Sequence, residues 1–180
     1  MIKITGGKYR GRNLKFTLNK ELRPTTSFFR QWIFNVLQNH LNYDDLIILD
    51  LFSGSGVVGI EFLSRGASKV TFIDQDRNTN LMLSQFLKEI GETSSKVLTG
   101  DVLKFIETND LNDFNIIFFD PPYKTDFLYQ VLEILNKKNL KSGMLLIFET
   151  SAKSEIDFTG FKVLKEKSSG TTKMVILEKL

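Results

Sequence analysis

The segment Asp120-Pro121-Pro122-Tyr123 has the residue types needed to hold an aryl amine for reaction. Two consecutive prolines restrict the backbone and remove two N–H donors, so the nearby carbonyl groups remain free to accept hydrogen bonds. An aryl amine is a weak nucleophile because its lone pair is conjugated with the ring. Asp120 and the Pro121 carbonyl could each accept one of its N–H bonds, while Tyr123 stacks on the ring as aromatic residues do on unpaired bases. The segment predicts a site for group transfer to the exocyclic amine of a nucleic-acid base.

The position of this tetrapeptide strengthens that interpretation. Taken alone, it is also compatible with an ordinary turn. It follows an apolar run at residues 114–119, about seventy residues after a glycine-rich loop that follows another apolar run. Ligands of open α/β sheets bind at the carboxyl ends of strands, where such loops meet.

The glycine-rich loop is the second segment with chemical potential, and it reads Asp50-Leu51-Phe52-Ser53-Gly54-Ser55-Gly56-Val57-Val58-Gly59. Glycines let the backbone approach a ligand closely, and the helix that follows points free N–H groups at it. Gly54, Gly56 and Gly59 satisfy the G-x-G-x-x-G pattern, with Asp74 twenty residues after Gly54, so a dinucleotide site is one interpretation. A purely structural turn is another.

Asp50 favours a different ligand. A dinucleotide places two phosphates at this turn, and a carboxylate about 4 Å from one of them costs on the order of 4 kcal/mol at an effective dielectric near 20. S-adenosylmethionine carries an ammonium and a sulfonium and no phosphate, so Asp50 is a favourable neighbour for it. Asp74 is placed to bind the two ribose hydroxyls. Asp101 could accept a hydrogen bond from the adenine amine, cap the next helix, or do both.

The elements that must position these residues alternate between strands and helices. Strands are expected at 46–51, 69–74, 96–99, 115–120 and 144–149, and helices at 57–65, 77–90, 102–108 and 127–136. Such alternation predicts a mainly parallel sheet covered on both faces. Segments 161–167 and 173–177, joined by a short turn, predict an antiparallel hairpin at the sheet edge.

The N-terminal segment differs from the rest of the chain in charge. Residues 1–30 contain eight of the 24 Lys and Arg but one of the 21 acidic residues, a net charge of +7; the remaining 16 basic and 20 acidic residues give −4. A short hairpin within 1–16 and a helix over 27–41 are expected here. A basic extension on an acidic body favours a polyanionic partner, although a solvated tail has the same composition.

Composition excludes several classes of protein. The chain of 180 residues is 42% hydrophobic, which suits one domain, 1–180, with residues 1–45 as extension and 46–180 as core. Without cysteine it has no disulfide or thiolate metal site, and its single histidine offers no metal cluster. The N-terminus does not resemble a signal peptide, and no apolar run is long enough to span a bilayer. We expect a soluble, cytoplasmic, monomeric protein without a metal.

The whole pattern resembles class I S-adenosylmethionine-dependent methyltransferases, and more narrowly the RsmD family, the bacterial 16S ribosomal RNA guanine-N2 methyltransferases. The N-terminal motifs are the specific ones: 6–12 (Gly-Gly-Lys-Tyr-Arg-Gly-Arg) and 22–26 (Leu-Arg-Pro-Thr-Thr). Phe34-Asn35, the loop running into Ile60-Glu61, and 63–67 match as well. The resemblance implies a Rossmann-like, seven-stranded α/β sheet with an antiparallel edge strand.

The resemblance also implies a substrate and a set of site residues. The substrate is one guanine of 16S RNA, in the assembling 30S subunit, and the cofactor is S-adenosyl-L-methionine. Catalytic residues would be Asp120, Pro121, Pro122 and Tyr123. Cofactor-binding residues would be Asp50, Phe52, Ser53, Gly54, Ser55, Gly56, Asp74, Asp101 and Val102. RNA-binding residues would be Lys8, Arg10, Arg12, Arg23, Thr25 and Arg30.

Three positions depart from the family pattern. After Arg-Pro-Thr-Thr the family usually has an acidic residue, an arginine and later a glutamate, where this chain has Ser27, Phe28 and Gln31. Three other functions remain open from the sequence: a DNA adenine or cytosine amine methyltransferase, a dinucleotide oxidoreductase, and a catalytically silent RNA-binding assembly factor. The absence of a separate target-recognition domain counts against the DNA enzyme.

Overall fold

The structure is a computed structural model, and it describes residues 2–14, 25–122 and 126–180. Two residues of the predicted site, Arg23 and Tyr123, lie outside these described ranges. The predictions made for them therefore stay predictions.

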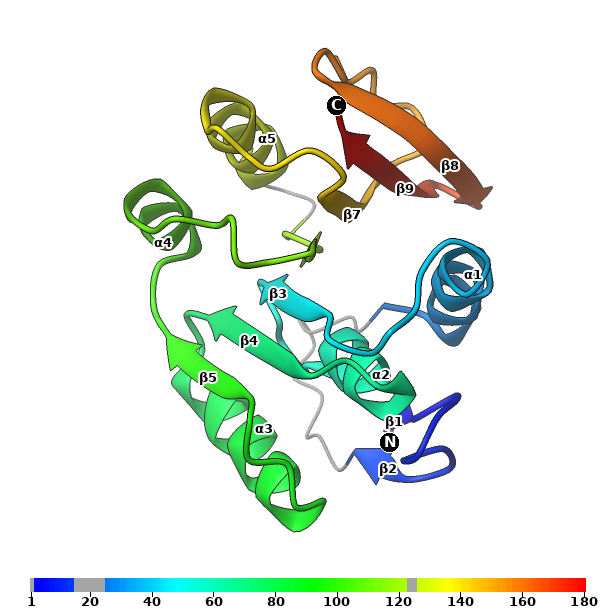
Figure 1. The fold of residues 1–180 in the computed structure, drawn as a ribbon, viewed down its shortest axis with the longest axis vertical. Helices are drawn as coiled ribbons and strands as arrows, with labels where there is room; N and C mark the ends of the chain where they lie inside the picture. The colour runs from blue at the N-terminus through cyan, green and yellow to red at the C-terminus, as the bar shows by residue number, and fades with distance from the viewer. Residues whose placement is uncertain (1, 15–24, 123–125) are drawn as a thin grey trace.

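A seven-stranded sheet forms the centre of the molecule. Across the sheet the strands are β5 (Lys96–Thr99), β4 (Lys69–Asp74), β3 (Ile47–Leu51), β6 (Ile116–Phe119), β7 (Leu145–Ser151), β9 (Thr172–Lys179) and β8 (Phe161–Ser169) (Figure 1). The first five are parallel, and β9 pairs antiparallel with both β7 and β8. The predicted parallel sheet and its antiparallel edge hairpin are confirmed.

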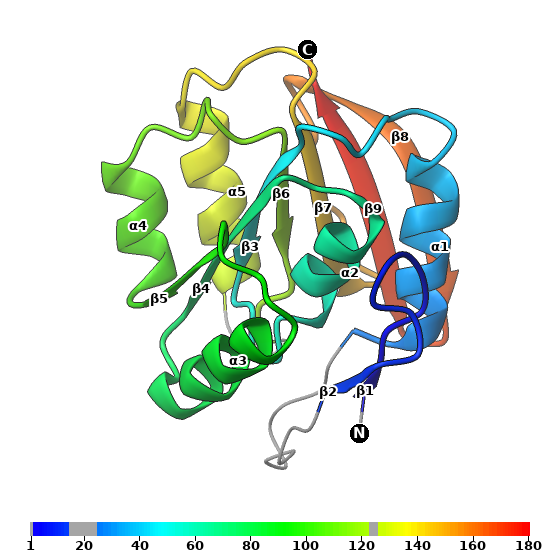
Figure 2. The same cartoon turned by 60° about the horizontal axis from the view of Figure 1, so that its bottom comes forward.

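Helices cover both faces, as predicted. Side chains of α1 (Ser27–Leu37), α2 (Val57–Arg65) and α3 (Arg77–Glu89) contribute to one hydrophobic cluster, and those of α4 (Val102–Thr108) and α5 (Phe127–Lys137) to the other. Figure 2 shows α2 and α3 on the near side of the sheet, with α4 and α5 grouped together away from them.

The central strands are apolar on both faces because each face is covered by helices. In β6, Ile116 and Phe118 join the first cluster, while Ile117 and Phe119 join the second. All four side chains are at most 3% exposed. The same alternation runs through β3, where Ile48 faces the first cluster and Leu49 and Leu51 face the second. It follows that Asp50 points to the face that carries α2.

The N-terminal hairpin packs tightly against the end of α2. Its strands are β1 (Ile2–Lys3) and β2 (Asn13–Leu14). The Lys8 N–H donates to the Ser64 carbonyl at 2.6 Å, and the Ser64 hydroxyl donates to the Gly6 carbonyl at 2.5 Å. Gly7 has φ +74°, and a Cβ atom there would lie 1.8 Å from the Ser64 carbonyl oxygen. Glycine at position 7 is therefore required for this close approach.

Glu61 connects the hairpin, α1 and α2. Its side chain is fully buried and accepts hydrogen bonds from the Arg30 guanidinium (2.8 Å), the Thr5 backbone N–H (2.8 Å), the Thr5 hydroxyl (2.9 Å) and the Arg65 guanidinium. Arg30 also donates to the Lys3 carbonyl at 3.0 Å. Glu61 is thus neither a surface acid nor a ligand of the predicted cofactor loop.

Two expected elements are shorter than predicted. The first helix ends at Leu37 instead of residue 41, because the His40 N–H bonds to the Leu37 carbonyl and tightens the last turn. Each strand of the N-terminal hairpin has two residues, and the chain between them is closed by the Ile4 N–H bond to the Arg12 carbonyl.

Within the described ranges, no helix is long and apolar enough to cross a membrane. Nor do the described His, Asp and Glu side chains form any group of three that could hold a metal ion.

We expect Glu61→Gln to lower the free energy of unfolding by about 3 kcal/mol, since it leaves buried guanidinium charge without its counterion. Urea denaturation of the purified protein measures the effect. Glu133→Gln is the matched control, because Glu133 pairs with Lys137 on the exposed face of α5 and should leave the midpoint unchanged. Equal shifts for both variants would show that the buried pairing stabilises nothing.

Candidate active site

The two segments with chemical potential meet at one edge of the sheet. β3 and β6 are parallel neighbours, with Leu51 opposite Phe119, so both loops leave the sheet side by side. The sequential order of the strands reverses between β3 and β6, and this reversal is where open α/β sheets bind ligands. The glycine-rich loop and the double-proline segment therefore border the same site.

The glycine-rich loop is a compact turn with three residues in the left-handed region. Phe52 has φ 53°, Gly54 46° and Gly56 67°. The Ser53 N–H donates to the Ile73 carbonyl at 3.1 Å, and the Gly56 N–H donates to the Ser53 carbonyl at 2.6 Å. The loop is held against the end of β4, with Ser55 buried and Phe52 half-buried.

Asp50 is a buried carboxylate without a positive partner among the described residues. It is 1% exposed, and its Oδ2 accepts the Gly59 N–H at 3.0 Å, while no hydrogen-bond donor of the described residues reaches Oδ1. Burial raises the pKa of Asp50 well above its ordinary value. The Gly59 bond partly offsets this effect, and the charges of Asp74 and Asp120 add to it. The geometry suits a cationic ligand beside Oδ1.

Asp74 fixes the glycine-rich loop. Its Oδ2 accepts the Gly54 N–H at 2.8 Å, and its Oδ1 accepts the Asp76 N–H at 2.9 Å. The buried Asn80 amide donates to the Asp74 carbonyl at 2.9 Å and to the Thr99 hydroxyl at 3.0 Å, which joins the ends of β4 and β5. Each carboxylate oxygen keeps a second lone pair, so the proposed ribose contact stays compatible with this arrangement.

Asp101 caps the N-terminus of α4, which is one of the two roles predicted for it. Its Oδ1 accepts the Lys104 N–H at 3.0 Å, and the carboxylate is exposed at the edge of the sheet. The next residue, Val102, is buried in the second cluster. The capping role is confirmed, and the adenine contact stays a prediction.

Asp120 lies at the end of β6 with a carboxylate that is only partly accessible. Its Oδ2 accepts the Thr25 hydroxyl at 3.4 Å. Burial raises the pKa of Asp120 to about 7, and the Thr25 bond partly offsets this rise. Pro121 is buried and Pro122 is exposed. Asp120 therefore follows the strand next to β3, which carries Asp50, and its role as an acceptor for the amine stays a prediction.

Glu149 is a site residue that sequence reasoning missed. Phe148 pairs with Phe119 across β6 and β7, so Glu149 follows directly beside Asp120. Burial raises the pKa of Glu149 to about 8, and the Asp120 charge adds to this rise. A signal was available: like Asp50 and Asp120, Glu149 is an acid at the carboxyl end of a buried apolar strand.

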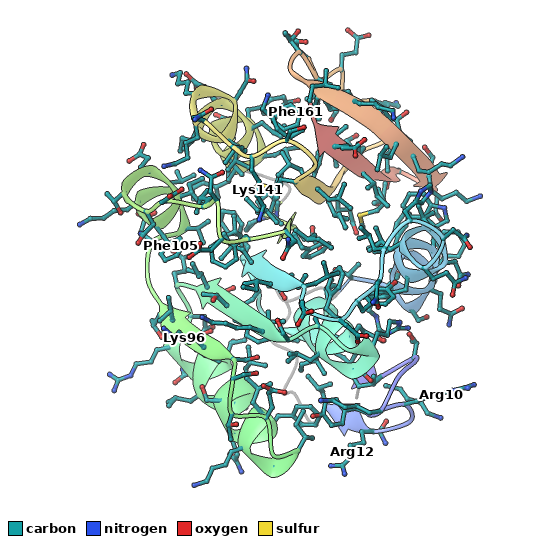
Figure 3. The ribbon with its side chains drawn as sticks, in the orientation of Figure 1. Arg10, Arg12, Lys96, Phe105, Lys141 and Phe161 are labelled. Atoms are coloured by element: carbon teal, nitrogen blue, oxygen red, sulfur yellow. The ribbon has the colours of Figure 1, made fainter. Side chains whose placement is uncertain are left out.

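The predicted RNA-binding residues divide into two groups. Lys8, Arg10 and Arg12 are exposed on the hairpin, and Figure 3 shows Arg10 and Arg12 extending away from the body. Arg30 is 4% exposed and pairs with Glu61, so the prediction that it contacts phosphate does not fit its burial. Thr25 is buried and contacts Asp120, so it lies beside the carboxylate at the end of β6 instead of on an exposed RNA-binding face.

A cleft of about 780 Å³ lies between the hairpin and the start of α1. The basic residues Lys3, Arg10 and Arg30 line it, together with Thr25, whose hydroxyl contacts Asp120. The cleft thus extends from the basic hairpin to Thr25, the residue that contacts the carboxylate at the end of β6.

Comparison with known proteins assigns the chain to a family. A family model described as "Conserved hypothetical protein 95" matches residues 2–178. Ribosomal RNA small subunit methyltransferase D of Escherichia coli K12 is 33% identical over 150 residues, 83% of this chain and 74% of that protein. The protein of the same name from Buchnera aphidicola (strain Bp) is 34% identical over 149 residues, 82% of this chain and 75% of that protein. The chain belongs to the RsmD family.

A solved structure agrees with this assignment. The putative methyltransferase yhhF from Escherichia coli superposes with a TM-score of 0.87 at 29% identity, covering 99% of this chain and 97% of that one. The predicted class I methyltransferase fold is confirmed.

The three departures from the RsmD pattern lie together on the first turns of α1. Ser27, Phe28 and Gln31 are exposed, and Ser27 and Gln31 line the cleft. Phe28 is 48% exposed. No hydrogen bond or ion pair joins these three described residues to Asp50, Asp120 or Glu149, so the departures affect the cleft.

Gly59 keeps Asp50 in position, and we expect Gly59→Ala to lower the free energy of unfolding by roughly 1–3 kcal/mol. The new Cβ would lie 2.2 Å from Phe72 Cε1 and 2.9 Å from Asp50 Oδ2. Chemical denaturation measures the change. Gly100→Ala is the control, because a Cβ there meets nothing within 4 Å. A Gly59→Ala protein as stable as the control would contradict this packing.

Proposed function

We propose that this protein transfers a methyl group from S-adenosylmethionine to the exocyclic N2 amine of one guanine in 16S ribosomal RNA. The observation that carries the proposal is the juxtaposition, on neighbouring strands, of two carboxylates: buried Asp50, whose Oδ1 has no donor among the described residues, and Asp120 beside two prolines. Membership of the RsmD family and the names of its relatives support the ribosomal substrate.

The chain's own residues fit the methyl donor. Asp50 Oδ1 is a buried acceptor that lacks a donor among the described residues, and it would receive the donor's ammonium group. The loop from Phe52 through Ser53, Gly54, Ser55 and Gly56 would border the ligand, with Asp74 on the ribose and Asp101 and Val102 beside the adenine. When bound, the donor supplies a methyl group on a positively charged sulfur, which is an excellent leaving group.

The same observation counts against a dinucleotide. The G-x-G-x-x-G pattern is satisfied, but the loop surrounds a carboxylate for which no described Lys or Arg provides compensation. Bringing two phosphates to this loop would add like charge at a buried site, which is costly at low dielectric.

At the other half of the site, the chain positions the acceptor amine. Asp120 and the Pro121 carbonyl would each accept one N–H bond of the amine, drawing its nitrogen toward a tetrahedral arrangement and directing the lone pair at the methyl group. Orientation of this kind is what the protein must supply, because the leaving group is already activated. The Thr25 hydroxyl holds the Asp120 carboxylate in place.

RNA would reach the site along the basic cleft. Lys8, Arg10 and Arg12 are exposed on the hairpin, where Arg10 lines the cleft, and they would contact phosphates of the RNA. A flipped base would then lie near Thr25 and Asp120 at the other end. We propose further that a monomer acts on the assembling 30S subunit in the cytoplasm, where a ribosomal substrate is present.

The deciding experiment is transfer of a labelled methyl group to 30S subunits purified from cells that lack the modification. Label recovered as N2-methylguanosine in 16S RNA supports the proposal, and Asp120→Ala should abolish the incorporation. Label in DNA adenine or cytosine instead would identify the DNA enzyme. No label in either, with tight NADH binding, would identify an oxidoreductase. If the Asp120→Ala variant still supports subunit assembly in cells as well as the wild-type protein does, the protein is a catalytically silent assembly factor.

We expect Asp50→Asn to weaken binding of S-adenosylmethionine by roughly 10- to 100-fold, as loss of one buried charge-assisted hydrogen bond does. Asparagine keeps an acceptor for the Gly59 N–H but places an NH2 group at the position of Oδ1, so both the charge and the free acceptor are lost. Isothermal titration calorimetry measures the affinity, and circular dichroism checks the fold. Unchanged affinity would remove Asp50 from the cofactor site.

We expect methyl transfer to fall as pH decreases through about 7. The pKa of Asp120 is raised to about 7 by burial, so below that value the carboxyl is protonated and cannot accept the amine N–H. The measurement is kcat/KM for 30S subunits across this pH range. Calorimetry measures the affinity for S-adenosylmethionine at the same pH values, and so distinguishes protonation of Asp50 from protonation of Asp120. A flat profile between about pH 6 and 8 would contradict the role given to Asp120.

A further inference from the structure

Three neighbouring strands each present one carboxylate to the same edge and face of the sheet: Asp50 on β3, Asp120 after β6 and Glu149 on β7. The register fixes this arrangement, since Leu51 lies opposite Phe119 and Phe119 opposite Phe148. The rings of Phe119 and Phe148 stack on the opposite face, with centroids 5.0 Å apart and planes at 17°. Because side chains alternate along a strand, the next residues, Asp120 and Glu149, lie side by side on the face of α2.

These carboxylates lack positive partners within the part of the chain that the structure describes. No described Lys or Arg forms an ion pair with Asp50, Asp120 or Glu149. On β9, the residue opposite Glu149 is the uncharged Met174, and the adjacent Lys173 forms an ion pair with Glu166 instead. Asp50 Oδ1 is a fully buried acceptor without a donor. Buried carboxylates are costly unless donors satisfy them, so this row is built to receive donors from a ligand.

The bases that carry an exocyclic amine differ at the ring nitrogen next to it. In guanine, the N1 atom beside the amine carries a hydrogen and donates. In adenine the neighbouring N1, and in cytosine the neighbouring N3, are acceptors without a hydrogen. A carboxylate beside the amine therefore attracts guanine and repels the other two.

We propose that Glu149 selects guanine by accepting its N1–H while Asp120 holds the N2 amine. The inference rests on the proposed function. The double-proline segment can bind any aryl amine and does not distinguish between bases, so the inference assigns that discrimination to Glu149. Two adjacent acceptors match the two adjacent donors of the guanine edge, and sites that hydrogen-bond a substrate group reject analogues that lack it.

The ionisation of Glu149 agrees with this role. Burial, with the Asp120 charge, raises the pKa of Glu149 to about 8 in the ligand-free protein. A guanine N1–H would stabilise the ionised form, whereas a protonated Glu149 would donate to an acceptor ring nitrogen. The preference for guanine should therefore grow as pH rises past about 8, and this pH dependence should disappear without the carboxyl.

The test compares two bases at the target position of 16S RNA in reassembled 30S subunits: guanine, and 2-aminopurine, which keeps the amine but has no hydrogen on N1. At a pH above about 8, where Glu149 is ionised, we expect the wild-type protein to prefer guanine in kcat/KM, and Glu149→Gln to reduce that preference roughly 10- to 100-fold, since its amide can donate to N1. Binding of S-adenosylmethionine should be unchanged. A wild-type preference retained in Glu149→Gln overturns the proposal.

Two further variants make the result decisive. Glu178→Gln is the matched control, because Glu178 pairs with Leu145 at the opposite end of β7 and should keep the wild-type preference. If Glu149→Gln does not fold, Glu149→Met replaces it, an apolar side chain of similar length that cannot bond to N1 and should also lose the preference. A wild-type protein that does not methylate guanine overturns the proposed function itself; an active wild-type protein with an unaltered preference in Glu149→Met overturns this inference alone.

Discussion

Parallel pairing between β3 and β6 is the constraint on which the whole site depends. It places the glycine-rich loop and the double-proline segment at neighbouring positions of one sheet edge, with Leu51 opposite Phe119. The pairing is rigid because both strands are buried on both faces by the two hydrophobic clusters. Direct transfer between two bound molecules needs such fixed geometry, since small displacements of reacting atoms are costly in rate.

The energetics of the site follow from what that pairing buries. Aligning apolar strands brings Asp50, Asp120 and Glu149 into a region where the charged form of a carboxyl is disfavoured, and the pKa values of all three are raised. Among the described residues, the buried acid Glu61 differs from these three, because Arg30 and Arg65 compensate its charge. One buried carboxylate thus stabilises the junction between hairpin and core, and three others stay available for ligands.

Local pattern was enough to predict the sheet, the helices of the core and the loops at its edge. Apolar runs bounded by glycine and proline mark the strands and helices of the core, and even α2 and α4 begin and end at the predicted residues.

The contacts between distant segments could not be predicted. Arg30 appears as one more basic residue of an N-terminal extension, and only its packing against Glu61, 31 positions away, removes it from the surface. Thr25 meets Asp120 across 95 positions, for which no local pattern gives a signal. Glu149 was within reach of the strand-end rule that identified Asp50.

The hairpin is seated on Ser64 in the last turn of the same helix whose first residue follows Gly56. A nine-residue α-helix is a stiff rod of about 13 Å, so it transmits position from one of its ends to the other with little loss. A partner bound to the N-terminal hairpin is therefore held at a fixed position relative to the glycine-rich loop, because α2 is a continuous helix between them. A partner that shifted the arm would have to tilt α2, and with it the end of the glycine-rich loop at Gly56.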